Sequence, residues 1–587
     1  MIFPARSDLR AASVSVNATS AWPNRYDIAV FALIAAALVL IVRAAHDMGL
    51  PLAQLHAAPV TLDPANLPNY ALRTTLRMFA AILSSLLFTL VVGALAAKSR
   101  KAELVIIPAL DILQSVPVLG FLTFTVVFFM GLFPGSQLGA ELAAIFAIFT
   151  SQAWNMAFSF YQSLATVPRD LDEACRHFRL SPWLRFWRLE VPFATPGLVW
   201  NTMMSMSGDW FFVVASEAIT VGDTKVQLPG IGSYLALAIE QRDIGAVGAA
   251  VVAMAIVILI YDQLIFRPTV AWADKFRFEA TAAQARPKSW VYDIVRRTRL
   301  LKRSVAVALR ARDSLQQLPA SLWGRWPHHW SLPRVSSRLA LASDWLWLAV
   351  VLAVTAWSLW TVVAYVRAKL GLADLREASW AGLLTLIRVL VLIATASVIW
   401  VPIGVWIGLR PWAAERVQPV AQFLAAFPAN VLFPFFVVGI AAWHLDPNIW
   451  LSPLMVLGTQ WYILFNVIAG ASAFPTDLRE AASMYRLRSW QWWRQVILPG
   501  IFPYYVTGAL TASGGSWNAS IVAEVASWGD TKLEATGLGS YIAKATEAGD
   551  FHRVVLGIAV MSFFVVLFNR LLWRRLYTYA ERKLRLD

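Results

Sequence analysis

The chain has few charged residues and almost no cysteine. Of its 587 residues, 14% are Asp, Glu, Lys or Arg, whereas a soluble protein of this length carries about a quarter. The single cysteine, Cys175, excludes an internal disulfide bond. The sequence also lacks a Gly-rich loop followed by Lys-Ser or Lys-Thr, a His/Cys cluster with metal-ligand spacing, and a catalytic triad. We therefore expect no ATP-binding cradle, no metal site, no cofactor and no catalytic residues in this chain.

Long apolar runs take the place of charge, for example Ile28–Val42, Met78–Ala97 and Gly245–Ile260. A helix needs about 20 mostly apolar residues to cross a bilayer, and the runs are continuous rather than alternating. The sequence thus predicts an all-α membrane protein with about twelve transmembrane helices. They are expected near residues 27–45, 74–97, 104–133, 138–160, 194–217, 244–266, 344–366, 381–409, 417–443, 449–470, 500–523 and 551–573.

Basic residues predict the orientation. The net charge is +15, and most of the 50 Lys and Arg residues fall on the inner side if the N-terminus is cytoplasmic. Membrane proteins keep Lys and Arg on that side, so both termini are expected in the cytoplasm. The polar segment 1–26 has no short apolar core with a cleavage site behind it, which predicts that no signal peptide is removed. We do not expect nucleic-acid binding.

The second half of the chain repeats the first. A shift of 307 positions takes Pro192 onto Pro499, and Gly222-Asp223-Thr224-Lys225 recurs as Gly529-Asp530-Thr531-Lys532. Upstream the shift is 311, where Arg77 matches Arg388 and Pro117 matches Pro428. Six helices per half return the chain to its starting side, so the two six-helix repeats are parallel. They are expected at 27–266 and 344–587.

A basic linker is expected between the repeats, at 267–343. It carries 15 Lys and Arg against four Asp and Glu, together with Trp323, Trp326 and Trp330. Such a segment is typical of a cytoplasmic surface that lies on anionic lipid headgroups.

Two segments on the basic side share a pattern. The first runs from Glu173-Ala174-Cys175 through Arg179 to Leu189-Glu190-Val191-Pro192. The second runs from Glu480-Ala481-Ala482 through Arg486 to Val496-Ile497-Leu498-Pro499. Each follows a transmembrane helix and a proline, Pro168 or Pro475, that restarts the chain. Each is expected to be a short amphipathic helical segment.

This spacing resembles the cytoplasmic signature of permease subunits of bacterial ABC importers, in which Glu-Ala-Ala is followed after three residues by glycine and later by aliphatic-x-aliphatic-Pro. This chain departs from the signature at the glycine, which is Arg179 in the first segment and Arg486 in the second. In the first segment Cys175 also replaces the second alanine. The resemblance implies a type I permease pseudo-dimer in the bacterial inner membrane. The segments would be coupling helices that contact two separate ATP-binding subunits, which hold ATP and magnesium. An extracytoplasmic solute-binding protein is implied as a further partner.

Within this family the chain looks most like permeases for nitrate, sulfonate or bicarbonate-type anions. Residues on and beside two matching helices are candidates for the pathway or its gate, because polar groups in membranes are costly: Asp209, Trp210, Glu217, Lys225, Ser516, Trp517, Asn518, Glu524 and Lys532. Glu217 and Glu524 are expected to hold the Gly-Asp-Thr-Lys loop, and Lys225 and Lys532 to attract an anion or lie in a solvated turn. Arg77 and Arg388 are expected to reach headgroups or face the vestibule.

Asp209 leaves alternatives open. Its repeat partner is Ser516, and an ionised carboxylate in the path would repel an anion. A carboxyl packed against a neighbouring helix is as good an interpretation as a gate. Permeases for ferric iron, amino acids or betaine therefore remain alternatives. So do an ion-coupled secondary transporter and a membrane scaffold that does not transport.

Overall fold

The computed structural model describes residues 39, 42, 60–115, 118–178, 180–221, 224–276, 289–298, 337–472, 474 and 476–583. The described residues are almost entirely helical, with two short β-hairpins. The predicted segment 1–26, nearly all of the helix predicted at 27–45 and most of the basic linker lie outside the described residues.

The first repeat contains η1 Pro64–Asn66, α4 Leu67–Lys98, α5 Arg100–Ser115, α6 Val118–Leu132, α7 Gln137–Ala165, α8 Arg169–His177, α9 Pro182–Arg185, η2 Phe186–Glu190, α10 Val191–Glu217, β1 Ala218–Val221, β2 Thr224–Gln227, α11 Ile231–Glu240, α12 Ile244–Tyr261, η3 Asp262–Phe266, α13 Arg267–Ala273 and η4 Asp274–Phe276. Helix α14, Trp290–Arg297, follows in the linker. The helical run that begins at Ile244 thus continues to Phe276, beyond the boundary predicted at 266.

The second repeat contains α16 Ser337–Arg367, α17 Leu372–Gly408, α18 Pro411–Ala426, η5 Ala429–Leu432, α19 Phe433–Ala442, α20 Pro447–Trp450, α21 Pro453–Leu457, α22 Gln460–Ser472, α23 Thr476–Met484, α24 Ser489–Trp492, η6 Trp493–Ile497, α25 Leu498–Ala523, β3 Val525–Trp528, β4 Thr531–Glu534, α26 Leu538–Glu547, α27 Phe551–Phe568, η7 Asn569–Trp573 and α28 Arg574–Lys583. The order of elements repeats that of the first half, which confirms the predicted duplication.

Among the described residues, seven helices are long and apolar enough to cross a membrane, or up to nine if each bent pair is one span. The exact number of twelve stays a prediction. The helix predicted at 417–443 is broken, because α18 and the η5–α19 segment meet at 76°. Phe427 at the break has an extended backbone, which is the conformation that the following Pro428 imposes. The helix predicted at 449–470 bends by 44° between α21 and α22.

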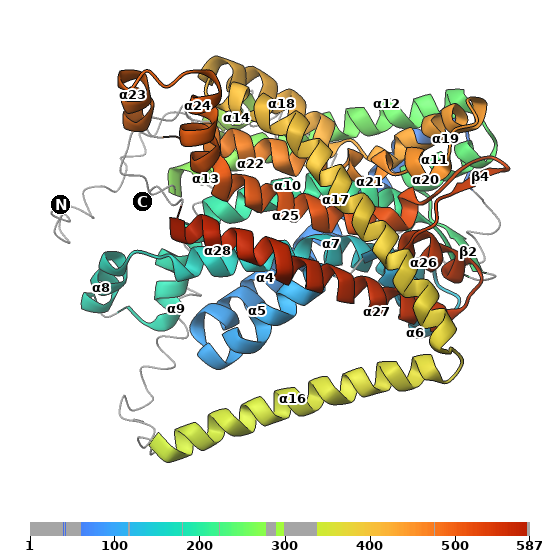
Figure 1. The fold of residues 1–587 in the computed structure, drawn as a ribbon, viewed down its shortest axis with the longest axis horizontal. Coiled ribbons are helices and arrows are strands. Elements are labelled where there is room, and N and C mark those ends of the chain that lie inside the picture. Colours follow the sequence, from blue (N-terminus) through green and yellow to red (C-terminus); the bar gives the residue numbers. More distant parts are fainter. Residues whose placement is uncertain are drawn as a thin grey trace.

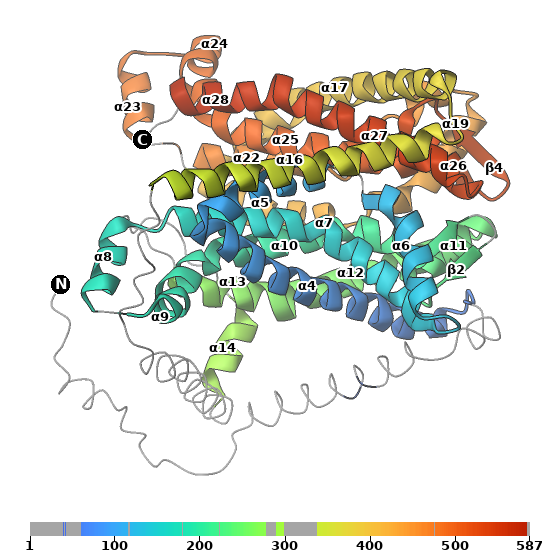
Figure 2. The same ribbon diagram turned by 90° about the horizontal axis from the view of Figure 1, so that it is seen from below.

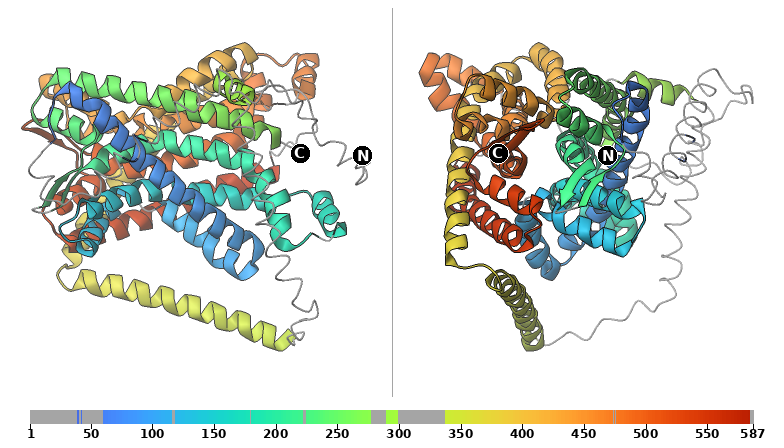
Figure 3. Two further views of the ribbon diagram at one scale, coloured as in Figure 1. Left: turned by 180° about the vertical axis from the view of Figure 1, so that it is seen from behind. Right: turned by 90° about the vertical axis from the view of Figure 1, so that its right-hand side faces the viewer.

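The two repeats lie side by side with their long helices running in similar directions (Figure 1, Figure 3). Segments α8–α9 and α23–α24 project from one end of the molecule, and both hairpins lie at the opposite end (Figure 1, Figure 2). The repeats interlock, since α5 and α6 contact α27 and α25, and α18 contacts α10 and α12. The interface between the repeats includes polar contacts. For example, Asn518 Oδ1 accepts a hydrogen bond from the Val118 amide at 2.6 Å.

Candidate functional site

The first predicted coupling segment consists of α8, α9 and the π-helical turn η2, which leads directly into α10. Glu173 is exposed, whereas Ala174 is half-buried. Leu189 lies in η2, and Pro192 occupies the first turn of α10, where a missing backbone N–H has no cost. The signature therefore extends from the exposed helix α8 to α9, which continues through η2 into α10 as one helical run.

The second segment repeats this path through α23, α24 and η6 into α25. Glu480 is exposed, Ala481 is half-buried, Val496 lies in η6 and Pro499 in the first turn of α25. Both segments lie at the same end of the molecule (Figure 1). A pair of partners on one side of the membrane would reach both.

The glycine position of the signature has a structural explanation. Helix α23 ends with hydrogen bonds from the Leu487 amide to Ala482 O and from the Arg486 amide to Ser483 O, the two bonds of a Schellman motif. This motif needs a left-handed residue, and Arg486 has φ of +53°. The backbone at this position therefore has a conformation that glycine adopts readily, although the residue is arginine. In the first segment the Leu180 amide bonds to Cys175 O in the equivalent way, although Arg179 lies outside the described residues.

The two segments are attached to the membrane domain by different forces. In the first, the Glu190 carboxylate lies 3.0 Å from both Lys98 Nζ and Arg185 Nε, and Arg185 continues to Asp172 at 2.7 Å. The repeat shifts place Leu409, Trp492, Ile497 and Arg479 at the corresponding positions of the second half. Ile497 is fully buried, and Leu409 and Trp492 pack against the main hydrophobic core. An ion-pair chain in one half is thus replaced by apolar packing in the other.

At the opposite end, Glu217 organises the first repeat. Its carboxylate accepts hydrogen bonds from Thr74 Oγ1, Arg77 Nη1 and the Gly232 amide, each at 2.7 Å. Arg77 also contacts Glu141 through two nitrogens, and all three charged side chains are at most 1% exposed. One guanidinium therefore balances two buried carboxylates.

Glu524 repeats this arrangement in the second half. It accepts from Thr385 Oγ1 at 2.8 Å, Arg388 Nη1 at 3.0 Å and the Ser540 amide at 3.1 Å. The position of Glu141 is taken by Asn448, whose Oδ1 accepts from Arg388 Nη2 at 3.2 Å. This cluster therefore pairs one cation with one anion.

The first cluster corrects the expectation for Arg77. Arg77 is fully buried in an ion pair, so it neither reaches headgroups nor faces a vestibule. Arg388 is paired with Glu524 and is only partly buried, so its orientation toward a vestibule stays a prediction. The glutamates bind the backbone at the start of α11 and α26, just after the hairpins. A Cβ at Gly230 or Gly537 would come within 2.3 Å of the Glu217 or Glu524 carboxylate, so only glycine fits there.

The other pathway candidates lie on α10 and α25. Asp209 is on α10, but its side chain is outside the described part of the structure. Trp210 and Trp517 are 0% and 1% exposed, and Trp210 Nε1 donates to Tyr261 OH at 2.7 Å, so they pack the interior. Ser516 Oγ lies 2.9 Å from Thr459 Oγ1, and Asn518 binds across the interface to Val118.

The two lysines lie at equivalent places on the hairpins. Lys225 pairs with Thr220 in the β1–β2 register, and Lys532 with Ser527 in the β3–β4 register. The Lys532 ammonium lies 2.6 Å from the Glu547 carboxylate, so its charge is neutralised by a neighbour. The side chain of Lys225 is outside the described part.

Sequence reasoning also missed the contact of the second hairpin with the first repeat. Arg242 Nη2 lies 2.9 Å from Asp530 Oδ2, and the Gly529 amide donates to Ile239 O at 3.0 Å. The second hairpin is thereby joined to the end of α11 in the first repeat. The signal was available, because Asp530 belongs to the repeated Gly-Asp-Thr-Lys motif, but its partner is far away in the sequence.

Each of the two interlocked repeats matches a known protein family. The family described as "binding-protein-dependent transport system inner membrane component" matches residues 69–266 and again residues 400–586. The chain belongs to this family. It carries the family's domain twice, and its described helices include several that are long and apolar enough to cross a membrane.

Three relatives are permeases. The chain is 27% identical over 192 residues to the nitrate import permease protein NrtB of Leptolyngbya laminosa, covering 33% of this chain and 65% of that protein. It is 27% identical over 192 residues to the bicarbonate transport system permease protein CmpB of Synechococcus elongatus, covering 32% and 66%. It is 28% identical over 189 residues to the glycine betaine/carnitine transport permease protein GbuB of Listeria monocytogenes, covering 31% and 61%. The chain thus spans slightly less than two thirds of these relatives.

Proposed function

We propose that this chain forms the transmembrane pathway of an ATP-driven importer for a small oxyanion of the nitrate, sulfonate or bicarbonate class. Two separate ATP-binding subunits would engage α8–α9 and α23–α24 on the cytoplasmic side. A solute-binding protein would deliver the cargo at the hairpin end. Both termini would be cytoplasmic.

The observation that carries this proposal is the placement of the two signature segments. They project from the same end and expose Glu173 and Glu480, and their second helices, α9 and α24, continue through η2 and η6 into the interlocked helices α10 and α25. Closure of two partner subunits would move both segments together and rock the repeats against each other. The oxyanion class rests on the names of the nitrate and bicarbonate relatives.

A betaine cargo is the second candidate. GbuB has about the same percentage identity to this chain as the anion permeases, over a slightly smaller share of each protein. Asp209 on α10 would also favour a cargo that carries a positive charge.

The test begins with purification from native membranes in mild detergent, followed by mass spectrometry and an ATP-hydrolysis assay. We expect a co-purifying subunit with a phosphate-binding loop. Uptake of labelled nitrate, bicarbonate and glycine betaine into proteoliposomes of that complex then separates the two cargo classes. The double variant Glu173→Lys, Glu480→Lys should abolish uptake while membrane insertion is retained.

Glu377→Lys is the matched control, since Glu377 is an exposed carboxylate in the second turn of α17 and lies outside both coupling segments. Its uptake should equal that of the wild type. Unchanged uptake in the double variant would contradict the coupling role. Uptake that follows an ion gradient and ignores ATP would indicate a secondary transporter instead.

A further inference from the structure

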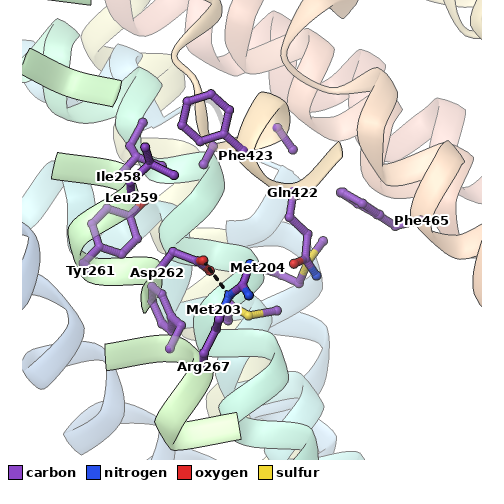
Figure 4. A pocket seen from close by; sticks show the side chains of 13 residues that line it. Met203, Met204, Ile258, Leu259, Tyr261, Asp262, Arg267, Gln422, Phe423 and Phe465 are labelled. Atoms are coloured by element: carbon purple, nitrogen blue, oxygen red, sulfur yellow. Dashed lines mark hydrogen bonds and ion pairs between the residues drawn. The ribbon is translucent and has the colours of Figure 1, made fainter. Parts of the chain in front are cut away.

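A cavity lies between the two repeats, on the side of the molecule nearer the coupling segments. Its walls come from α10 and the α12–α13 run of the first repeat and from α18 and α22 of the second. Most of the lining is apolar, including Met204, Ile258 and Phe465. The polar side chains are Asp262, Arg267 and Gln422 (Figure 4). A mostly apolar cavity with a few convergent polar groups is the usual form of a small-molecule site.

The polar groups are arranged around the guanidinium. Asp262 Oδ2 accepts from Arg267 Nε at 2.9 Å and from Gln263 Nε2 at 3.1 Å. Within the described part of the chain, the terminal nitrogens of Arg267 have no protein partner. Figure 4 shows the Gln422 side chain extending from α18 toward Arg267. Asp262 therefore holds the guanidinium at Nε. The terminal nitrogens stay available on the side of the opposite repeat.

We infer that Arg267 and Gln422 form an oxyanion-binding subsite between the repeats, on the release side of the pathway. The terminal guanidinium nitrogens present a planar pair of donors that matches two oxygens of a nitrate, bicarbonate or phosphate group. The Gln422 amide supplies a further donor from the other repeat. This inference deepens the proposed function, and its link to cargo release rests on it.

The repeat explains why only one such site is expected. The shift of 307 places Asn569 and Arg574 at the positions of Asp262 and Arg267, and the shift of 311 places Asp111 at the position of Gln422. The sequence of the second copy thus has a carboxylic acid, Asp111, where the first copy has the Gln422 amide, and a carboxylate would repel an anion. In the first copy the Asp262 carboxylate binds Arg267 Nε, and the opposite repeat offers the Gln422 amide, which is uncharged and has an NH2 group that can donate to an anion.

The experiment measures the melting temperature of the full chain in detergent, with sodium nitrate titrated against sodium chloride at constant ionic strength. Nitrate should raise the melting temperature of the wild type in a saturable manner. Arg267→Gln should lose this shift, and Arg267→Lys, which keeps the charge but not the fork, should weaken the apparent affinity by about tenfold. Asp262→Asn should bind at least as tightly as the wild type, because a repelling charge is removed.

Arg574→Gln is the matched control, because it removes the same charge at the repeat-related position. It should retain the full nitrate shift. Equal shifts of the melting temperature in the wild type and Arg267→Gln would overturn the inference. So would a wild type whose melting temperature responds neither to nitrate nor to an anionic lipid. The Arg267→Lys and Asp262→Asn variants keep the test informative if Arg267→Gln fails to fold.

A second arm separates a dissolved anion from a lipid headgroup. The same variants are placed in phosphatidylcholine nanodiscs with and without phosphatidylglycerol. A shift that depends on Arg267 and on nitrate assigns the site to a dissolved oxyanion. A shift that depends on Arg267 and on phosphatidylglycerol alone assigns it to a lipid phosphate, and it overturns the release-side role. Because both arms use the isolated chain, their outcome is independent of whether an ATP-binding subunit is found.

Discussion

Glu190 and Ile497 occupy the same repeat position, 307 residues apart, and both are buried, with 6% and 0% of their surface exposed. One is held by Lys98 and Arg185, and the other by the hydrophobic core. Ion pairs require a partner at every charge, whereas apolar packing requires only volume. The first coupling segment should therefore be the more sensitive of the two to a single substitution.

Glu190→Gln leaves Lys98 and Arg185 without their shared carboxylate. We expect a loss of about 1–2 kcal/mol, discounted because both cations are partly exposed to solvent. Thermal unfolding in detergent would show it as a lower melting temperature. Replacement of the set by its counterpart, Lys98→Leu, Arg185→Trp and Glu190→Ile, should restore much of the loss. Arg188→Gln, at an exposed position of the same turn, is the control and should be neutral.

The two buried carboxylate clusters should respond differently to neutralisation. Glu217→Gln leaves Arg77 paired with Glu141, so the cost should stay below about 1 kcal/mol. Glu524→Gln leaves Arg388 with only the Asn448 amide, and we expect a cost of about 2–4 kcal/mol. Melting temperatures of the two variants, measured side by side, check this order. Equal losses would mean that the charge imbalance has no energetic consequence.

The glycines that face these carboxylates should not accept alanine. Gly230→Ala and Gly537→Ala place a methyl group against Glu217 or Glu524, which should cost about 1–3 kcal/mol. Gly514→Ala is the control, because a Cβ at that helical position meets nothing within 4 Å. It should be neutral or stabilising by up to about 1 kcal/mol. Expression yield in membranes and melting temperature are the measurements.

Arg486→Gly should stabilise the second coupling segment. The left-handed backbone at Arg486 costs an ordinary residue about 1 kcal/mol, and glycine removes most of this cost. Arg488→Gly removes the same charge at a residue with φ of −130°, so it should bring no gain. Resistance of the α23–α24 segment to limited proteolysis would compare the two variants. A gain in both would indicate a charge effect rather than relief of strain.

Cys175 offers a probe of partner binding, because it is the only cysteine of the chain. Burial raises the pKa of its thiol, so the reactive thiolate is scarce at neutral pH. At pH values below that pKa, the thiolate fraction grows about tenfold for each unit by which the pH is raised, so maleimide labelling should accelerate by the same factor. Engagement of the first segment by an ATP-binding subunit should slow the labelling further at every pH. Labelling that ignores the added subunit would contradict contact at α8.

The fold was largely predictable, because apolar runs and a repeated sequence depend on local pattern and on comparison within the chain. The breaks at Phe427 and between α21 and α22 were not, since a helix that bends inside a membrane protein keeps the composition of a straight one. The buried role of Arg77 was also missed. Its partners Glu141 and Glu217 are 64 and 140 residues away, and no local signal joins them.

The contact of Arg242 with Asp530 shows how mutations can act on the two halves separately. The repeat mate of Arg242 is Gly549, so only one of the two hairpins can be held in this way. In a transporter assembled from two identical chains, every mutation would appear on both sides of the pore at once. Here a single codon change alters one wall alone, so selection can adjust the two sides independently.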